Sequence, residues 1–318
     1  MATLSTIHPD GKVDTIAEIL NQTNEVLEDM VWLEGNLPTG HRTTVRTGLP
    51  EPTWRKLYGG VQPNRSTTSQ IVDNTGSLEA YAEVDKALAD LNGNTAGFRL
   101  SEDRAHIEGM NQEFTSTLFY GNEGTEPEAF TGFAPRFNST SAANGENVIA
   151  GGGSGADNNS IWLVCWGPNT VHGIYPKGSI GGLQMEDKGQ ATIENVDGSQ
   201  GRMEAYRTHY RWDCGLTVRD WRYVVRIPNI DLTKNAASGA DLIDLMTQAT
   251  EQLPSLSMGK CVFYVSRKTR SFLRRQIMNK VANSTLTMDM VGGKMVTMFD
   301  GIPVRRCDAL AANEAVVS

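Results

Sequence analysis

The sequence predicts an α+β protein, because three patterns in it indicate both kinds of structure. Residues 13–33 and 101–120 repeat apolar residues at three- and four-residue steps, which is the spacing of amphipathic helices. Residues 161–227 are rich in aromatic and β-branched residues, which favour strands. Beyond residue 238 helical and strand patterns alternate, as they do in an α/β unit. With 318 residues, of which 39% are hydrophobic, the chain can bury a sizeable core.

The first predicted helix, over residues 13–33, is markedly acidic. Asp14 is placed as a possible N-cap, and the apolar stripe includes Ile16, Leu20 and Leu27. Residues 1–34 hold seven acids against one base. The helix therefore stands at the start of the chain with a strong negative charge.

Residues 36–76 differ abruptly in composition, with four prolines, many Thr and Ser residues, and five bases against two acids. The β-prone flanks, 41–47 and 67–72, enclose a turn-rich middle, which predicts a long two-stranded excursion. A two-stranded ribbon is at best marginally stable in water by itself, so it needs another surface to lie on. Its middle also holds apolar side chains that cannot be buried locally: Trp54, Leu57, Tyr58 and Val61.

The second predicted helix, over residues 101–120, follows a short apolar alternation at 78–84. Ser101 is a good N-cap, Gly121 ends the pattern, and one stripe contains Ile107, Met110, Phe114 and Leu118. At roughly 1.5 Å per residue this helix spans about 30 Å. We expect it to be the backbone of a domain.

The rest of the chain is predicted to be a loop, a β-rich stretch and an α/β unit. Residues 125–160 have loop composition and end in a glycine run. Strands are predicted at 161–166, 171–175, 203–212 and 221–227, followed by a helix at 238–253, a buried strand at 261–265, a basic helix at 266–281, a hairpin turn at Gly292 and Gly293, and a last strand from residue 301.

Charge and cysteine usage exclude several classes of protein. The formal net charge of −8 is not suited to holding nucleic acid through phosphate neutralisation, so we expect any enclosed DNA to be contacted only loosely. No apolar run is long enough for a membrane span and no secretory leader is present, which predicts synthesis in a cytoplasm and no membrane. The four cysteines form no CxxC pair, so we expect reduced, mostly buried thiols.

Tests for catalytic and ligand-binding motifs are negative. The glycine run at 151–155 lacks the Lys and Ser/Thr of a P-loop, and His106 and Glu108 lack the PCxxC that completes a deaminase zinc site. Neither GxSxG nor HExxH occurs. We therefore predict no catalytic, cofactor-binding or metal site, and no enzyme.

The basic helix at 266–281 has two interpretations. Its six bases are Arg267, Lys268, Arg270, Arg274, Arg275 and Lys280. They could form a nucleic-acid face, or else a solvated or inter-subunit ion-pair surface. The negative net charge of the chain favours the second interpretation.

The order of these parts, together with several short strings, carries a family resemblance. The strings are TWRKL at 53–57, GVQP at 60–63, LADLNGNTAGF at 88–98, EGMN at 108–111, LFYG at 118–121, WGPNT at 166–170 and LTVRDWRY at 216–223. The sequence resembles the major capsid proteins of tailed bacteriophages, which have the Hong Kong 97 fold. It is similar in particular to a short-tailed, podovirus-like subgroup.

The resemblance implies a division of the chain into four parts. They are an N-terminal arm (1–35), an extended β-hairpin loop (36–77), a peripheral domain with the spine helix 101–120 (78–232) and an axial domain (233–318). The only long aromatic strand pair, 203–212 with 216–227, precedes the α/β unit and is expected beside the spine helix. The last strand lies too close to residue 318 for a return to the peripheral domain, so we infer permuted strand connectivity.

The resemblance also implies the function and partners. We expect a structural protein of the virion that self-assembles through pentameric and hexameric rings into an icosahedral shell around double-stranded phage DNA. Assembly is expected in the host bacterial cytoplasm, with a portal protein at one vertex and a separate scaffolding protein, and a cement or decoration protein is an optional further partner. No cofactor is expected. The alternatives are the shell of a cellular nanocompartment of the same fold and, from another class, a soluble α/β hydrolase.

Subunit contacts are the functional sites of such a protein. We predict that the hairpin tip is buried against another subunit, and that ion pairs join the acidic arm to the basic hairpin of a neighbour. The residues predicted at these contacts are Trp54, Arg55, Lys56, Leu57, Tyr58 and Val61 in the hairpin, and Glu25, Glu28, Asp29 and Trp32 in the arm.

Overall fold

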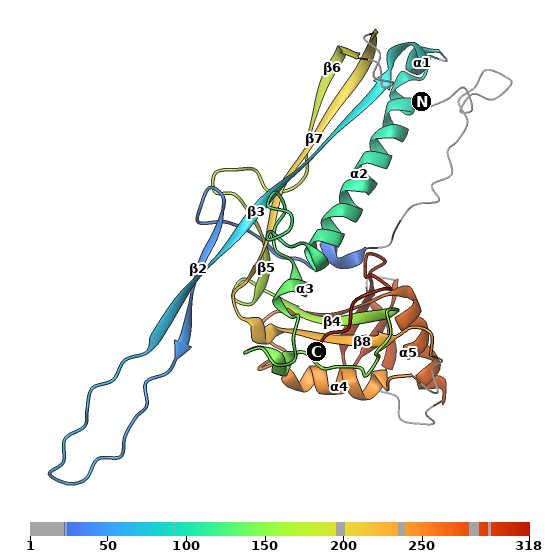
Figure 1. Cartoon of the computed structure of the whole chain (residues 1–318). Helices are drawn as coiled ribbons and strands as arrows, with labels where there is room; N and C mark the ends of the chain where they lie inside the picture. The colour runs from blue at the N-terminus through green and yellow to red at the C-terminus, as the bar shows by residue number, and fades with distance from the viewer. Residues whose placement is uncertain are drawn as a thin grey trace.

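The computed structural model describes residues 22, 24–91, 93–194, 201–234, 239–279, 286–291 and 294–318. In these residues the strands form one continuous 12-stranded sheet whose main path runs β10-β11-β12-β9-β4-β5-β7-β3-β2. Figure 1 shows a long upper ribbon with a helix beside it, a broader lower part with two helices, and a hairpin that projects away from both. The α+β class predicted from the sequence is confirmed.

The upper ribbon consists of three long antiparallel strands, β3 (Thr67–Asp85), β7 (Arg202–Val218) and β6 (Gln184–Glu194). Helix α2 (Thr95–Tyr120) lies along this ribbon, after the short helix α1 (Lys86–Asp90). Phe114 of α2 stacks on Trp212 of β7, with ring centroids 4.4 Å apart. The predicted apolar stripe is buried at Met110, Phe114 and Leu118, whereas Ile107 is exposed.

Helix α2 begins six residues earlier than the sequence predicted. Its N-cap is Asn94, whose side chain accepts a hydrogen bond from the backbone N–H of Gly97 at 3.2 Å. Asn94 therefore has the capping role that the sequence assigned to Ser101, at an earlier turn of the helix. The prediction of Ser101 as the start was wrong because both residues have capping chemistry and the earlier one is used.

The lower part is built around strand β4 (Asn158–Trp166), which is buried along its whole length. β4 pairs with β8 (Val224–Asp231) on one side and with β9 (Lys260–Val265) on the other. β9 in turn pairs in parallel with β12 (Ile302–Arg306), beside which lie β11 (Lys294–Phe299) and β10 (Leu286–Val291). Helices α4 (Leu242–Gln252) and α5 (Arg267–Asn279) cover this part.

The two faces of β4 belong to two different cores. Ile161, Leu163 and Cys165 pack with α4, α5 and β9, whereas Trp162 and Trp166 pack with α2 and its surroundings. This separation follows from the alternation of side chains along a strand. β4 therefore joins the upper and lower parts, and the predicted domain limits stay predictions.

The predicted pairing of 203–212 with 216–227 is wrong. Residues 216–218 continue β7, a 3-10 turn follows at Trp221–Tyr223, and β8 pairs with β4. The chain leaves the ribbon after Val218 because Asp220 caps that turn, accepting a hydrogen bond from Arg222 N–H at 3.1 Å. β7 does precede β9 and β12 along the chain, as expected. The permuted connectivity inferred from that order stays a prediction.

The arm is not helical where the structure describes it. Residues 13–21 and 23 of the predicted helix 13–33 lie outside the described residues, and the described remainder includes a 3-10 turn (Glu25–Glu28) and the start of strand β1 (Trp32–Glu34). β1 pairs in parallel with β5 (Val171–Tyr175), with Trp32 opposite Gly173. Tertiary contacts override helix propensity here, because Trp32 lies against the ring of Phe114, with centroids 5.8 Å apart.

Several smaller predictions have clear outcomes. α5 is capped as expected, since Ser266 Oγ accepts from the N–H of Thr269 at 3.3 Å, and all four cysteines are free and buried. α4 begins at Leu242 after the cap Asp241, later than predicted. Val291 lies opposite Lys294, as a two-residue hairpin requires, although Gly292 and Gly293 lie outside the described residues. No helix in the described ranges is long and apolar enough to cross a membrane.

A buried polar network fixes the C-terminal segment. Glu314 forms an ion pair with Arg226 of β8 at 2.8 Å, and both side chains are about 5% exposed. Glu314 also accepts a hydrogen bond from the hydroxyl of Tyr120 at the end of α2, at 2.5 Å. Burial and the charge of Glu314 raise the pKa of Tyr120 above its usual range. The network thus ties the chain end to both parts of the molecule.

Candidate assembly interface

The hairpin is formed by β2 (Gly40–Gly48) and the first half of β3, which pair antiparallel from Gly40 opposite Asn74 to Gly48 opposite Thr67. Beyond this pair, residues 49–66 form a tip without strands. Figure 1 shows the tip far from the rest of the molecule. The predicted two-stranded excursion is therefore present.

The apolar side chains of the tip have no cover within the chain. Trp54 and Tyr58 are fully exposed, at 103% and 106%, and Leu57 is 90% exposed. Burying one such aromatic side chain contributes on the order of 2 kcal/mol. The structure thus presents a large unused apolar area at the end of a projecting ribbon.

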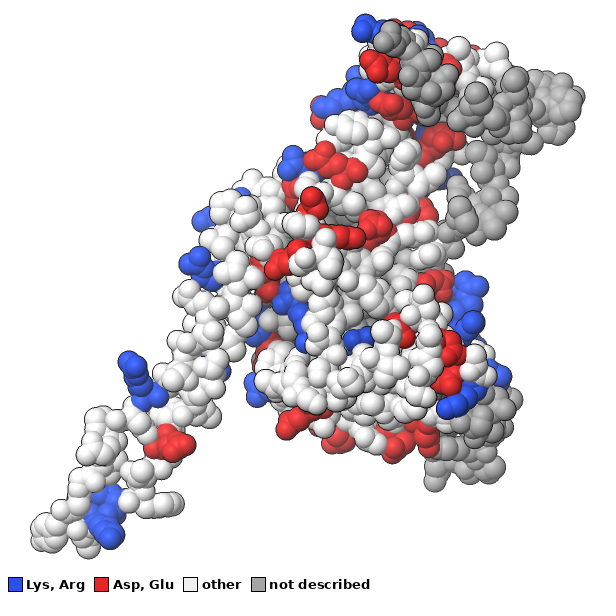
Figure 2. All heavy atoms as spheres, in the orientation of Figure 1, with Lys and Arg blue, Asp and Glu red and all other residues white. Residues whose placement is uncertain are grey.

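The tip is also basic. Arg55, Lys56 and Arg65 are exposed there, with Glu51 as the acid of residues 49–66. Figure 2 shows the blue and red side chains along the projecting hairpin against an otherwise uncharged surface. A partner surface for this tip should combine apolar area with acids.

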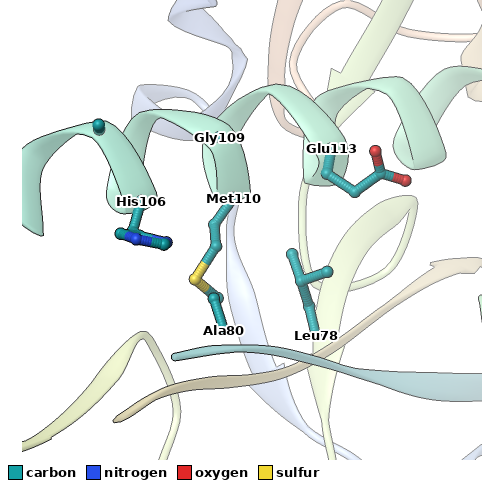
Figure 3. A pocket seen from close by; sticks show the side chains of 7 residues that line it. Leu78, Ala80, His106, Gly109, Met110 and Glu113 are labelled. Atoms are coloured by element: carbon teal, nitrogen blue, oxygen red, sulfur yellow. The ribbon is translucent and has the colours of Figure 1, made fainter. Parts of the chain in front are cut away.

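A hollow that meets this description lies between α2 and β3. Figure 3 shows Met110 of α2 pointing toward Ala80 and Leu78 of β3, with His106 and Glu113 on either side of Met110 along the helix. The hollow has a volume of about 340 Å³. A second hollow of about 160 Å³ shares Leu78 and Glu113 with it and continues toward Phe130. We call these two hollows together the α2–β3 groove.

Three acids of the arm, Glu25, Glu28 and Asp29, lie against the lower part of the same chain. Asp29 is 3% exposed and forms ion pairs with Arg305 at 3.2 Å and Lys260 at 2.5 Å. Arg305 also reaches Glu25 at 3.3 Å and Glu28 at 3.5 Å. Burial, with the charge of Asp29, raises the pKa of Tyr264, whose hydroxyl donates to Asp29 at 3.1 Å.

Trp32 is likewise enclosed by its own chain. Its ring lies 5.9 Å from that of Trp212, and a Cβ placed at Gly173 would come within 2.7 Å of it. Of the predicted interface residues, the hairpin set is free for a partner, whereas Asp29 and Trp32 serve the fold of the chain. The contacts between subunits themselves stay predictions.

The histidines considered for chemistry lie at two places among the described residues. The described residues contain no group of three or more His, Cys, Asp or Glu side chains that could hold a metal ion. His106 borders the α2–β3 groove, while Glu108 accepts from the backbone N–H of Gln22 at 2.9 Å. His41 and His172 form a buried pair with ring centroids 5.8 Å apart. Burial lowers the pKa of both, and that of His172 falls to about 4.

Comparison with known protein families shows which family this chain belongs to. The family model described as "Major capsid protein GP7" matches residues 8–318. The chain belongs to this family of phage major capsid proteins.

Solved structures agree with the family assignment. A protein chain in the solved structure of bacteriophage Epsilon15 is 36% identical to this chain, with a TM-score of 0.75; the match covers 99% of this chain and 96% of that one. The capsid of bacteriophage JBD30 shares the fold at 11% identity, with a TM-score of 0.53 over 95% of this chain and 99% of that one. No curated protein sequence matches the chain significantly. The capsid protein thus has the Hong Kong 97-type fold and is a component of a phage virion.

The sequence predicted the exposed hairpin tip of this capsid protein but not the α2–β3 groove. The exposed tip was visible because aromatic residues stand among prolines and glycines, where no core can form. The α2–β3 groove was missed because Met110 and Phe114 were assigned to a packed stripe. The signal that could have found it is the small residues beside them, Ala80, Ala105 and Gly109, which leave the space unfilled.

Proposed function

We propose that this capsid protein assembles through rings of five and six copies into an icosahedral shell that encloses double-stranded DNA. The observation that carries this proposal is the projecting tip, where Trp54 and Tyr58 are fully exposed. An exposed apolar patch on a ribbon favours a second surface. Because the tip and the rest of the molecule are different surfaces, the contact is heterologous, and a heterologous contact can close into rings.

The α2–β3 groove supports a particular acceptor for the tip. Leu78, Ala80 and Met110 give it an apolar floor, and Glu113 and Glu128 border it. The tip supplies exposed aromatic side chains and three bases. Apolar character and charge are therefore complementary between one copy's tip and its neighbour's groove.

Fewer acids of the arm than the sequence predicted are available to contact the hairpin of another copy. Asp29 is enclosed by Arg305 and Lys260, but Glu28 keeps 64% of its side chain exposed. Asp10, Asp14 and Glu18 precede the described residues and add negative charge. We retain the proposal that arm acids of one copy pair with Arg55 and Lys56 of another, as exposed pairs worth about 0.2–1 kcal/mol each.

Further partners belong to the same proposal. A closed shell that takes up DNA needs one vertex that differs from the others, so a portal protein is proposed there. A separate scaffolding protein and a cement protein are proposed as assembly partners, with assembly in the bacterial cytoplasm. The subunit itself performs no chemistry in this account.

Replacement of Trp54 by Ala tests the proposal. If the tip is buried between copies, Trp54→Ala removes about 2 kcal/mol or more from each contact, and the yield of shells falls at least about tenfold. Sedimentation and electron microscopy of the full-length protein measure that yield. Ile180→Ala is the matched control, because Ile180 is also exposed, at 73%, but lies outside the hairpin.

Three outcomes would count against the account. Shells of normal yield and stability from Trp54→Ala would remove the tip from the interface. Failure of the parent protein to form particles under any condition would remove the shell function itself. Particles that contain a protein cargo in place of DNA would indicate the nanocompartment alternative.

A further inference from the structure

Helices α4 and α5 of the lower part carry opposite charges. The eleven residues Leu242–Gln252 of α4 include Asp244 and Glu251, both exposed, and no Lys or Arg. The thirteen residues Arg267–Asn279 of α5 include five bases and no acid. Figure 2 shows red side chains along the lower edge of the molecule and blue ones at its lower right, where these helices lie.

The opposite charges do not neutralise each other within the chain. The helices are in contact, since Gln276 of α5 donates to the carbonyl of Ala240 at 2.6 Å and accepts from the N–H of Leu242 at 3.0 Å. Yet in the part of the chain that the structure describes, no ion pair involves Lys268, Arg274 or Arg275.

The acids of α4 are equally unused. Asp244 accepts a hydrogen bond from Gln248 one turn later, at 2.7 Å, and no ion pair to Asp244 or Glu251 occurs among the described residues. On α5 the bases crowd one another. Burial and the neighbouring charges of Arg274 and Arg306 lower the pKa of Arg270. Asp244 favours the N-terminal end of α4 because it lies in the first turn, but otherwise a single chain gains little from this segregation, whereas a partner of opposite sign would relieve it.

Helices α4 and α5 lie toward opposite sides of the lower sheet, in which the strand order is β8-β4-β9-β12-β11-β10. α4 packs against β8. α5 reaches β11, next to the edge strand β10, since Arg270 donates to Thr297 Oγ1 at 3.0 Å. Opposite flanks of a subunit are the surfaces that meet when copies are arranged in a ring.

We infer that the basic face of α5, formed by Lys268, Arg274 and Arg275, docks against the acidic face of α4, formed by Asp244 and Glu251, on the next copy of the chain. Apolar area adjoins the acidic face, because Leu256 and Met258 are exposed just after α4. This inference rests on the proposed ring assembly and adds a second contact to that of the hairpin. In this inference the bases of α5 bind a second copy of the chain and do not bind DNA. The net charge of −8 favours a protein partner over DNA.

The contact is tested by reversing the charges on α5, reversing those on α4, and then combining both sets of substitutions in one variant. Lys268→Glu with Arg275→Glu places acids on both sides, and Asp244→Lys with Glu251→Lys places bases on both sides. Each pair of substitutions should lower the yield of shells at least about tenfold, because like charges across an interface are strongly unfavourable. The combination of all four restores opposite signs and should recover most of the parent yield. Sedimentation and electron microscopy of the full-length protein give the readout.

Two controls separate this inference from folding defects and from the shell function. Arg104→Glu reverses an exposed base on α2 and should leave the yield unchanged, and circular dichroism should show each variant folded. The inference is overturned if the combined variant assembles no better than the single-sided ones, or if the α5 variant forms shells normally while losing affinity for double-stranded DNA. In either case parent shells would still support the proposed function.

Discussion

Trp54 and Trp32 differ mainly in what surrounds them. Trp32 lies between Phe114 and Trp212, with ring centroids within 6 Å, so its burial contributes to the stability of the single chain. Trp54 contacts nothing and is 103% exposed. Burial of Trp54 can therefore contribute only when another copy is present. The same residue type thus stabilises the single chain at one position and is proposed to stabilise a contact between copies at another.

His172 makes the folded chain sensitive to acid. It is fully buried between β7 and the hairpin base, and burial lowers its pKa from 6.5 to about 4, with Arg219 and His41 acting in the same direction. In the folded state, His172 therefore becomes protonated only at a lower pH than in the unfolded state. Stability is complete above about pH 6.5 and is lost as the pH falls toward 4, by on the order of 3 kcal/mol.

This prediction is measured by urea unfolding of the dissociated protein between pH 7 and pH 4. In the parent, the free energy of unfolding should decrease as the pH is lowered. The reason is that the imidazole of His172 is protonated in the unfolded chain at pH values where the buried imidazole stays neutral. His172→Gln keeps a polar side chain that does not titrate, so that part of the slope should disappear. Equal slopes for parent and variant would show that His172 is not the responsible group.

At the scale of elements, the arm is positioned by a glycine. A Cβ at Gly173 of β5 would lie 2.7 Å from the ring of Trp32, which is closer than real contacts allow. Only glycine lets β1 approach β5 with Trp32 between α2 and the ribbon. The docking of the arm thus depends on the backbone of one strand.

Gly173→Val should release the arm without unfolding the remaining chain. The valine side chain would occupy the space of the Trp32 ring, and the expected loss of stability is about 1–3 kcal/mol. Limited proteolysis and hydrogen exchange should show residues 24–34 becoming accessible. Gly109→Ala is the matched control, since a Cβ at Gly109 meets nothing within 4 Å. An arm as protected in Gly173→Val as in the parent would contradict this account.

The elements differ in how far the sequence predicts them. β4, β9 and α5 were predicted to within a few residues, because their buried runs and caps are local signals. β6 was not predicted, since an edge strand exposed on both faces has no hydrophobic period. The partner of β8 was predicted wrongly, because strand pairing depends on residues far apart in the chain.

The candidate interface divides in the same way. The exposed tip follows from local composition, so Trp54 and Tyr58 could be named from the sequence. The acids of the arm could not be placed, because their partners, Arg305 and Lys260, lie more than two hundred residues away along the chain. The α2–β3 groove lies between two elements that are separated in the sequence. It therefore could not be predicted from the pattern of either segment alone.

At the scale of the whole molecule, the continuous sheet links three surfaces that a shell needs. β3 belongs both to the hairpin and to the ribbon beside α2, so the tip and the groove are two ends of one strand system. β4 connects that ribbon to the part that carries α4 and α5. The three proposed contact surfaces therefore belong to one hydrogen-bonded sheet.

The central claim is that copies of this capsid protein assemble by placing the hairpin tip of one subunit on the α2–β3 groove of the next. Electron cryo-microscopy of assembled particles tests it most directly. The account predicts closed shells with rings of five and six in which Trp54 is buried against a neighbour's Leu78 and Met110. A map in which the tip of every subunit is solvent-exposed, or folded back on its own chain, would contradict the account.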